Sequence, residues 1–118
     1  MRLVHVPGAD GDESRVLATE VELADSLRSQ VRGLTFREAV PADFAMVFEF
    51  GRAGYRSIHM LFVRVPLDVL WLRDDTVVKS KTLSPWTGLG LARADRVVEL
   101  PAGAARHVDV GDTVRLER

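Results

Sequence analysis

The sequence predicts a mainly β fold, a twisted β-sandwich or partly closed barrel with one main α-helix packed on it. Seven or so short runs show strand patterns, and only one longer stretch has the spacing of an amphipathic helix. The length of 118 residues suits one hydrophobic core and is too short for two ordinary domains. We expect a single domain over residues 1–118, with a mobile N-terminal strand and loop over 1–15 and the main body over 16–118.

The first part of the main body predicts a strand followed by a helix. Residues Val16–Leu23 alternate between two faces, which is the period of a half-buried strand. Asp25 can then cap a helix that ends at Gly33. The apolar stripe of this helix has i, i+4, i+7 spacing and consists of Leu27, Val31 and Leu34. Because the helix is short, it must be stabilised by docking on the sheet.

The centre of the chain predicts a succession of core strands. Phe44–Phe50 alternates and ends at the glycine-containing segment 51–54, and Ile58–Val63 forms the next strand. Leu67–Arg73 and Thr76–Leu83 flank two aspartates, a pattern that predicts a β-hairpin.

The last part predicts a long loop, a strand, a turn of helix and a final strand. Ser84–Ala92 contains one proline and two glycines and is expected to be a loop. Arg96–Leu100 is a strand, and Pro101 opens a short helical turn over Ala102–Arg106. A turn at Gly111 leads into the last strand, Thr113–Glu117.

Composition excludes several classes of protein. The absence of cysteine removes disulfides, thiolate catalysis and every cysteine-based metal site. The three histidines have no metal-ligand spacing, so we expect neither a metal nor a cofactor. No stretch approaches the roughly 20 apolar residues that span a bilayer, and the first residues lack a secretory pattern. We therefore expect a soluble cytoplasmic protein that contacts no membrane.

Asp68 is the most constrained polar residue of the sequence. It shares its strand face with Leu70 and Leu72, and burial of an unpaired carboxylate would cost several kcal/mol. One interpretation is structural: the carboxylate accepts backbone N–H bonds in the turn after Pro66, or pairs with Arg32 or Arg37 from the helix. The alternative is functional, with Asp68 anchoring a ligand or acting as a general base.

Two further residues are candidates for a site. His59 lies in an apolar strand, where histidine is usually a satisfied core or edge residue, although a binding or proton-transfer role is open. Trp86 stands in a glycine-containing loop and either covers a hydrophobic gap or acts as a ligand-facing lid.

Seven short motifs, in order, resemble the family called domain of unknown function 192. They cover about residues 16–118, and the resemblance implies a compact β-rich fold with one main helix and no established activity. The motifs are Ala24–Arg37, Met46–Phe48, His59–Met60, Pro66–Val69, Pro85–Trp86, Val98–Gly103 and Val110–Asp112.

The expected function is that of a non-enzymatic module that binds a small molecule or a protein partner. Its site would lie at the barrel end, framed by Arg32, His59, Asp68 and Trp86. An enzyme that uses Asp68 or His59 in acid–base catalysis is the first alternative, and an interaction subunit is the second. A net charge of −1 and the lack of interleaved aromatics among the basic residues argue against nucleic-acid binding. We expect a monomer or weak dimer.

Overall fold

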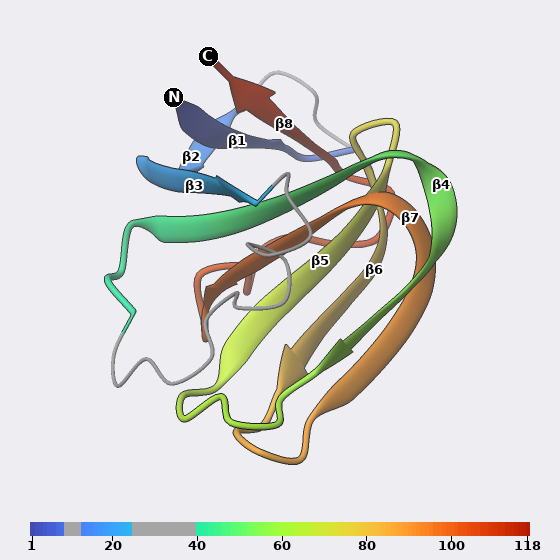
Figure 1. Ribbon diagram of the computed structural model, residues 1–118. Helices are drawn as coiled ribbons and strands as arrows, with labels where there is room; N and C mark the ends of the chain where they lie inside the picture. Colours follow the sequence, from blue (N-terminus) through green and yellow to red (C-terminus); the bar gives the residue numbers. More distant parts are fainter. Residues whose placement is uncertain (9–12, 25–39) are drawn as a thin grey trace.

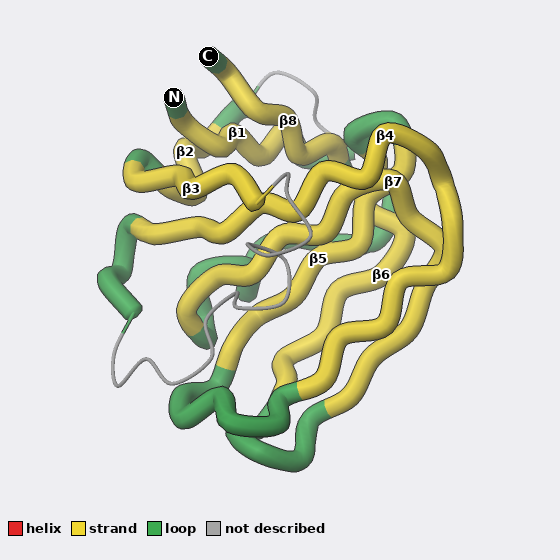
Figure 2. Tube along the Cα trace, viewed as in Figure 1, coloured by secondary structure: helices red, strands yellow, loops and turns green. Residues whose placement is uncertain are grey.

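The computed structural model describes residues 1–8, 13–24 and 40–118, and this part of the chain is built from β-strands (Figure 1). Figure 2 shows strands, loops and turns but no helix within these ranges, and none of the described segments is a helix that could cross a bilayer. The strands are β1 (Arg2–Val6), β2 (Arg15–Ala18), β3 (Glu20–Ala24), β4 (Phe44–His59), β5 (Leu67–Arg73), β6 (Thr76–Leu83), β7 (Leu89–Pro101) and β8 (Thr113–Glu117).

All eight strands form one sheet in the order β2-β1-β8-β6-β5-β7-β4-β3. The two edge strands, β2 and β3, follow each other in the chain and are separated only by Thr19. The sheet must therefore curl until its edges approach each other, although no ladder joins β2 to β3 and the barrel stays open. At this junction the backbone N–H groups of Thr19 and Glu20 both donate to the carbonyl oxygen of Asp43, each at 3.0 Å.

The long strands β4 and β7 run antiparallel and bend together (Figure 1). Their register shifts between Glu49 and Gly54, and Gly51 has a φ of 81°, a left-handed conformation that favours glycine. Beyond the bend, β4 residues 54–59 and β7 residues 89–94 form a two-stranded arm. The arm packs against β5 because the Trp71 ring N–H donates to the carbonyl oxygen of Arg56 at 2.9 Å.

The central strand β5 is buried on both of its faces. Val69 and Trp71 belong to one hydrophobic cluster, and Leu70 and Leu72 belong to another on the opposite side. The second cluster is covered by Ala105 and Val108 of the connection between β7 and β8. Burial on both sides explains why residues 67–72 are almost uniformly apolar.

The mainly β class and several predicted elements are confirmed. Strands are present over Leu67–Arg73, Thr76–Leu83 and Thr113–Glu117, and the first two form the expected hairpin. Its two turn residues, Asp74 and Asp75, have φ values of 51° and 65°, which is typical of a tight hairpin turn. The predicted helix from Asp25 to Gly33 lies outside the described residues, as do residues 9–12 of the predicted N-terminal strand and loop.

Other boundaries were wrong. The strand expected over Val16–Leu23 is two strands on opposite edges of the sheet, because Thr19 leaves the ladder to bond Asp43. Segment 51–54 bends β4 without ending it, so the strand continues to His59. Conversely, Met60–Val63 is a turn, closed by a 2.9 Å bond from the Val63 N–H to the Met60 carbonyl. Met60 and Val63 are nevertheless buried, so their apolar character reflects burial and not strand structure.

The predicted loop and helical turn near the end of the chain also differ. Residues 89–92 belong to β7, where they pair with β4. Residues 102–106 form successive β-turns, in which the N–H groups of Ala104, Arg106 and Val108 bond carbonyls three residues earlier. The intervening N–H groups of Gly103 and Ala105 bond a side chain, so the i to i−4 ladder of an α-helix does not form.

Gly90→Ala tests the close contact between the arm and β5. A Cβ at position 90 would lie 2.4 Å from the Cη2 atom of the buried Trp71 ring, so either the ring or the arm must move. We expect a loss of about 1–3 kcal/mol in the free energy of unfolding, measured by urea denaturation. Gly54→Ala is the matched control, because the atoms nearest to its Cβ belong to the guanidinium group of Arg56 and lie farther away, the first at 3.1 Å. Equal stability of the two variants would contradict the packing argument.

Candidate functional site

Asp68 anchors the connection between β7 and β8. Its side chain accepts hydrogen bonds at Oδ2 from the N–H groups of Gly103 (3.0 Å) and Ala105 (2.9 Å), and at Oδ1 from the Thr82 hydroxyl (2.7 Å). The residue is 4% exposed. The prediction that backbone N–H groups satisfy this carboxylate is correct in kind, but the donors come from residues 103–105 and not from the turn after Pro66.

A second buried carboxylate, Asp112, anchors the other end of the same connection. Its oxygens accept from the N–H groups of Gly8 (2.8 Å) and Asp109 (2.9 Å), and Oδ2 lies 2.8 Å from Nε2 of His5. Burial acts to raise the pKa of Asp112, but the hydrogen bonds from Asp109, Gly8 and His5 outweigh it and hold the pKa below its ordinary value. An ionised carboxylate can only accept, so His5 donates through Nε2–H.

His5 is the residue that these contacts orient. It is 1% exposed, and its second ring nitrogen, Nδ1, has no hydrogen-bond partner among the described residues. An unpaired buried nitrogen is unfavourable, and in native proteins such an atom commonly has a water or a ligand as its partner. Asp112 therefore holds the ring so that one nitrogen stays available.

A cavity of about 240 Å³ lies beside His5. Arg15 borders it because Arg15 is paired with His5 across the β1–β2 ladder. Arg106 and His107 enter from the β7–β8 connection, where the Arg106 guanidinium donates to the Gly103 carbonyl at 2.8 Å. The remaining described lining residues are Val16, Leu17, Ala42 and Ala104. The described lining thus combines two arginines and two histidines with apolar side chains, and it includes no acidic residue.

This arrangement has two chemical capacities. Guanidinium groups bind carboxylates and phosphates through paired N–H donors, so the cavity favours a small anion. In addition, a histidine whose Nε2–H is held by a carboxylate presents Nδ1 either as a base or, once protonated, as a donor. We call the cavity bordered by His5, Arg15, Arg106 and His107 the cationic pocket.

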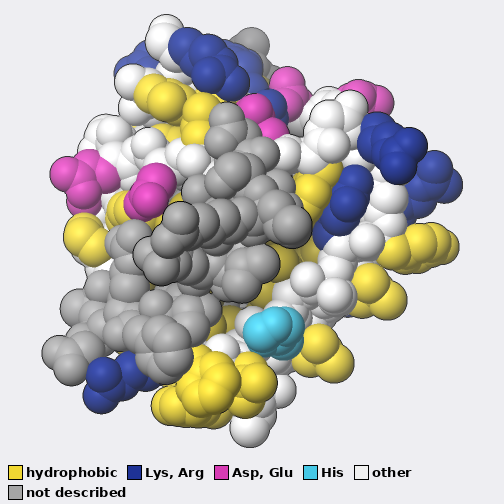
Figure 3. Space-filling view, viewed as in Figure 1, with side chains coloured by type: hydrophobic (Ala, Val, Ile, Leu, Met, Phe, Trp, Pro, Cys, Tyr) yellow, Lys and Arg dark blue, Asp and Glu magenta, His cyan; other side chains and the backbone are white. Residues whose placement is uncertain are grey.

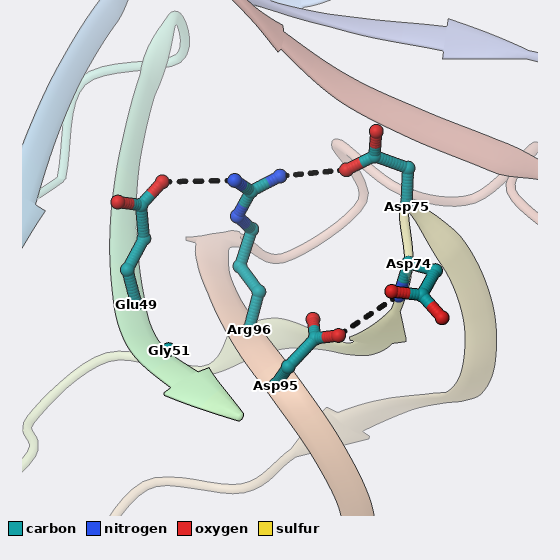
Figure 4. Close-up of a pocket in the computed structure, with 6 residues that line it drawn as sticks. All are labelled: Glu49, Gly51, Asp74, Asp75, Asp95 and Arg96. Atoms are coloured by element: carbon teal, nitrogen blue, oxygen red, sulfur yellow. Dashed lines mark hydrogen bonds and ion pairs between the residues drawn. The ribbon is translucent and has the colours of Figure 1, made fainter. Parts of the chain in front are cut away.

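A second cavity, of about 430 Å³, lies at the bend of β4 and is acidic (Figure 4). Arg96 bridges Glu49 and Asp75 at 2.8 Å each, and the Asp95 carboxylate accepts the N–H of Asp74 at 3.0 Å. These contacts join β4, β7 and the β5–β6 turn around Gly51. Among the described residues no group of three or more His, Asp or Glu side chains is placed to hold a metal ion.

Glu99 is a buried carboxyl group that lines neither of these two cavities. It is 5% exposed and lies between Met46 of β4 and Val69 of β5 in the ladders. Burial raises the pKa of Glu99 from 4.5 to about 7. The side chain is therefore largely neutral in slightly acidic solution and charged in alkaline solution.

The structure describes three of the four residues predicted for the site: His59, Asp68 and Trp86. His59 is exposed at the end of β4, and Trp86, 49% exposed, lies in the neighbouring loop. The Asp68 carboxylate accepts hydrogen bonds from the N–H groups of residues 103 and 105, in the connection between β7 and β8. Neither cavity described above is lined by His59, Asp68 or Trp86. Arg32 and Arg37 lie outside the described residues, so the four-residue site stays a prediction.

The sequence reasoning did not select His5, Arg15, Arg106, His107 or Asp112. His5 and Asp112 are 107 residues apart, and no local pattern joins them. One signal was available: in β1, His5 follows Leu3 on the same face of an apolar strand, as Asp68 precedes Leu70. The argument that a buried polar group needs a partner could have been applied to His5 as well.

The described residues define a mainly β protein built on one open, bent sheet of eight strands. Two solved structures are similar to it. A protein from Sinorhizobium meliloti 1021, described as a candidate transcription regulator, matches with a TM-score of 0.84 and 26% identity, over 97% of this chain and 92% of that one. A protein of unknown function from Novosphingobium aromaticivorans matches with a TM-score of 0.81 and 25% identity, over 97% and 84%.

The chain belongs to the family of domain of unknown function 192, an uncharacterised family whose pattern matches residues 9–116. Two curated relatives are UPF0127 proteins of Thermococcus. The one from T. gammatolerans is 34% identical over 106 residues, which are 86% of this chain and 69% of the relative. The one from T. kodakarensis is 31% identical over 99 residues, which are 80% of this chain and 63% of the relative. The predicted family is confirmed.

Asp68→Asn tests the anchoring of the β7–β8 connection. The substitution keeps the shape of the side chain but removes the charge from three hydrogen bonds, so we expect the free energy of unfolding to fall by about 1–2 kcal/mol. Urea denaturation measures the change. Asp109→Asn, at an exposed position in the same connection, is the control and should have little effect. An unchanged urea midpoint in Asp68→Asn would refute the anchoring role.

Glu99→Gln tests the buried carboxyl group. The folded-state pKa of about 7 exceeds the ordinary 4.5, so the wild-type protein loses stability as pH rises from 4.5 to 7, by about 3 kcal/mol at most. The amide cannot ionise and avoids this loss. Glu99→Gln should therefore gain stability relative to wild type between pH 5 and pH 8, whereas exposed Glu20→Gln should not. If the free energy of unfolding of Glu99→Gln differs from that of wild type by the same amount at every pH, this account is contradicted.

Proposed function

We propose that the protein is a binding module for a small anion that carries carboxylate or phosphate groups, and that the ligand occupies the cationic pocket. The observation that supports this most directly is the orientation of His5. Its Nε2–H is held by Asp112, its buried Nδ1 has no partner among the described residues, and His5 borders the cavity. A bound oxygen atom would satisfy this nitrogen and remove the cost of leaving it unpaired.

Charge supports the same ligand class. Arg15 and Arg106 approach the cavity from different elements, β2 and the β7–β8 connection, so an anion between them would contact both. The only carboxylate placed next to His5 by the described contacts, Asp112, bonds the far nitrogen of the ring. The pocket is therefore suited to negative charge.

The size of the cavity limits the ligand. Pockets for drug-sized molecules commonly measure about 300–1,000 Å³, and the cationic pocket measures about 240 Å³. The apolar side chains of Val16 and Leu17 line one part of it. These features favour a small carboxylic acid or phosphate ester with a short apolar portion.

The anchoring carboxylates explain why the pocket keeps its shape. Asp68 holds residues 103 and 105 directly before Arg106, and Asp112 holds residue 109 directly after His107 and Val108. The two residues that enter the cavity are thus flanked by bonded positions on either side. A preorganised pocket loses less conformational entropy when a ligand binds.

A second candidate function is an enzyme in which His5 acts as a general base. The carboxylate–histidine pair with one free ring nitrogen favours it, because the same pairing orients catalytic histidines in hydrolases. In this candidate function the acid–base residues would be His5 and Asp112, and not the Asp68 or His59 expected from the sequence. The described lining of the pocket includes no serine, threonine or cysteine, so a nucleophile would have to be water.

Anion titration of wild type and Arg106→Gln tests the proposal. Removing one charge-assisted contact, worth about 1.5–3 kcal/mol, should weaken binding of phosphate or citrate by about tenfold or more. Isothermal titration calorimetry at constant ionic strength measures the affinity. Arg73→Gln is the control, because Arg73 is exposed at the end of β5 and does not line the pocket.

His5→Gln should also weaken binding, since the amide can still bond Asp112 but presents no ring nitrogen to the cavity. If wild type binds none of a panel of small carboxylates and phosphate esters, the proposal fails. Equal losses of anion affinity in Arg73→Gln and Arg106→Gln would indicate nonspecific attraction of anions to the charged surface, without a specific pocket. Turnover of a bound ester that is abolished in His5→Gln would favour the enzyme over the binding module.

A further inference from the structure

Five large apolar side chains are exposed together at one end of the molecule. Each is between 44% and 60% exposed, and they belong to the turn after β4, the loop before β7 and the first residues of β7. Figure 1 shows these connections at the lower end of the sheet, and Figure 3 shows hydrophobic side chains gathered there. We call this surface the apolar tip, and it consists of Leu61, Phe62, Trp86, Leu89 and Leu91.

The two loops of the apolar tip are joined to each other. The Met60 N–H donates to the Gly88 carbonyl at 3.0 Å, and the Trp86 N–H donates to the Val63 carbonyl at 3.1 Å. The rings of Phe62 and Trp86 meet edge to face, with centroids 5.5 Å apart. The loops that carry these side chains are therefore joined, and two of the exposed rings are in contact.

The backbone at this surface adopts an unfavourable conformation. Phe62 and Trp86 have φ values of 65° and 66°, and bulky residues other than glycine are rare in this left-handed region. Such strain persists only where the surrounding structure imposes it, and it occurs often at functional positions. Here it holds two aromatic rings at the surface.

The two segments of sequence that carry the apolar tip have a net positive charge. Segments 52–66 and 76–93 contain six arginine or lysine residues and no aspartate or glutamate, although the whole chain has a net charge of −1. Two of the cations lie at the apolar tip itself: Lys79 and Lys81 donate at 2.9 Å to the carbonyl oxygens of Leu91 and Leu89. The six residues are Arg52, Arg56, Arg64, Lys79, Lys81 and Arg93.

We propose that the apolar tip docks on the interface of an anionic lipid bilayer. Tryptophan, phenylalanine and leucine enter the boundary between headgroups and acyl chains, and flanking lysines and arginines attract anionic headgroups. The charge of segments 52–66 and 76–93 is complementary to such a surface. Neither cavity described above includes an apolar-tip residue, so the surface offers no described groove for a peptide.

Single-stranded nucleic acid is also anionic and stacks on aromatic rings. It does not account for the three leucines, which contribute no ring and are each more than half exposed. The expectation that the protein contacts no membrane rested on the lack of a spanning segment, and that lack does not bear on docking at the surface. This inference is independent of the cationic pocket and of its ligand.

Co-sedimentation with vesicles tests the proposal. Wild type should bind vesicles of about one part phosphatidylglycerol to two parts phosphatidylcholine, and bind pure phosphatidylcholine more weakly. Leu89→Ser should reduce the bound fraction by about tenfold. Val110→Ser is the matched control, because Val110 is 64% exposed and Leu89 is 60% exposed, but Val110 lies outside the apolar tip. Lys81→Gln should weaken binding more than Arg73→Gln does.

Tryptophan fluorescence provides a second readout that reports insertion. Trp71 is fully buried and Trp86 is half exposed, so only Trp86 can change its surroundings on docking. Wild-type emission should shift to shorter wavelength with the mixed vesicles, and Trp86→Phe should lose this shift while still sedimenting. Because the substituted side chains are exposed, circular dichroism should show all variants folded.

Four results would overturn the proposal. The first is failure of wild type to bind the mixed vesicles at low salt, and the second is an equal loss of vesicle binding in Leu89→Ser and Val110→Ser. The third is binding of an oligothymidine without binding of vesicles. The fourth is self-association that buries Trp86 without lipid.

Discussion

The connection between β7 and β8 depends on two buried carboxylates. Asp68 and Asp112 each accept two backbone N–H groups, and each adds one side-chain contact, from Thr82 and from His5. The turns over 101–108 bond the N–H groups of residues 104, 106 and 108 to backbone carbonyls. Without the Asp68 carboxylate, the N–H groups of residues 103 and 105 would therefore need other hydrogen-bond acceptors. The same connection covers one hydrophobic cluster through Ala105 and Val108 and carries Arg106 and His107 into the cationic pocket. Packing and candidate function therefore share one set of hydrogen bonds.

The opposite part of the molecule depends on steric contact. The arm formed by β4 and β7 approaches β5 closely enough that position 90 has no space for a Cβ beside Trp71. Lys79 also lies over the Trp71 ring, at 5.4 Å, while its ammonium group reaches a β7 carbonyl. The bend that creates the arm is held by Arg96 between two carboxylates. As a result, the cationic pocket and the apolar tip lie on different elements, and each can be altered without disturbing the other.

Much of the fold could be read from local patterns. The strand over 67–73, the hairpin with the strand over 76–83 and the final strand were predicted with their observed bounds, because alternation and turn residues report on neighbouring positions. The errors have one cause. Met60 and Val63 are buried in a turn, and residues 89–92 pair in a strand although they include Gly90. In both segments, burial or pairing was imposed by distant parts of the chain and not by local propensity.

By itself, the sequence determined the β-rich class, the absence of cysteine, the family and the need for a partner at Asp68. Tertiary structure alone decided what that partner is, and it also decided which other side chains meet. The bonds from Asp68 to Gly103 and from His5 to Asp112 join residues 35 and 107 positions apart. The physical reason is that hydrophobic periodicity records which face of an element is buried, whereas hydrogen-bond partners are selected only when the sheet curls and brings separate segments into contact.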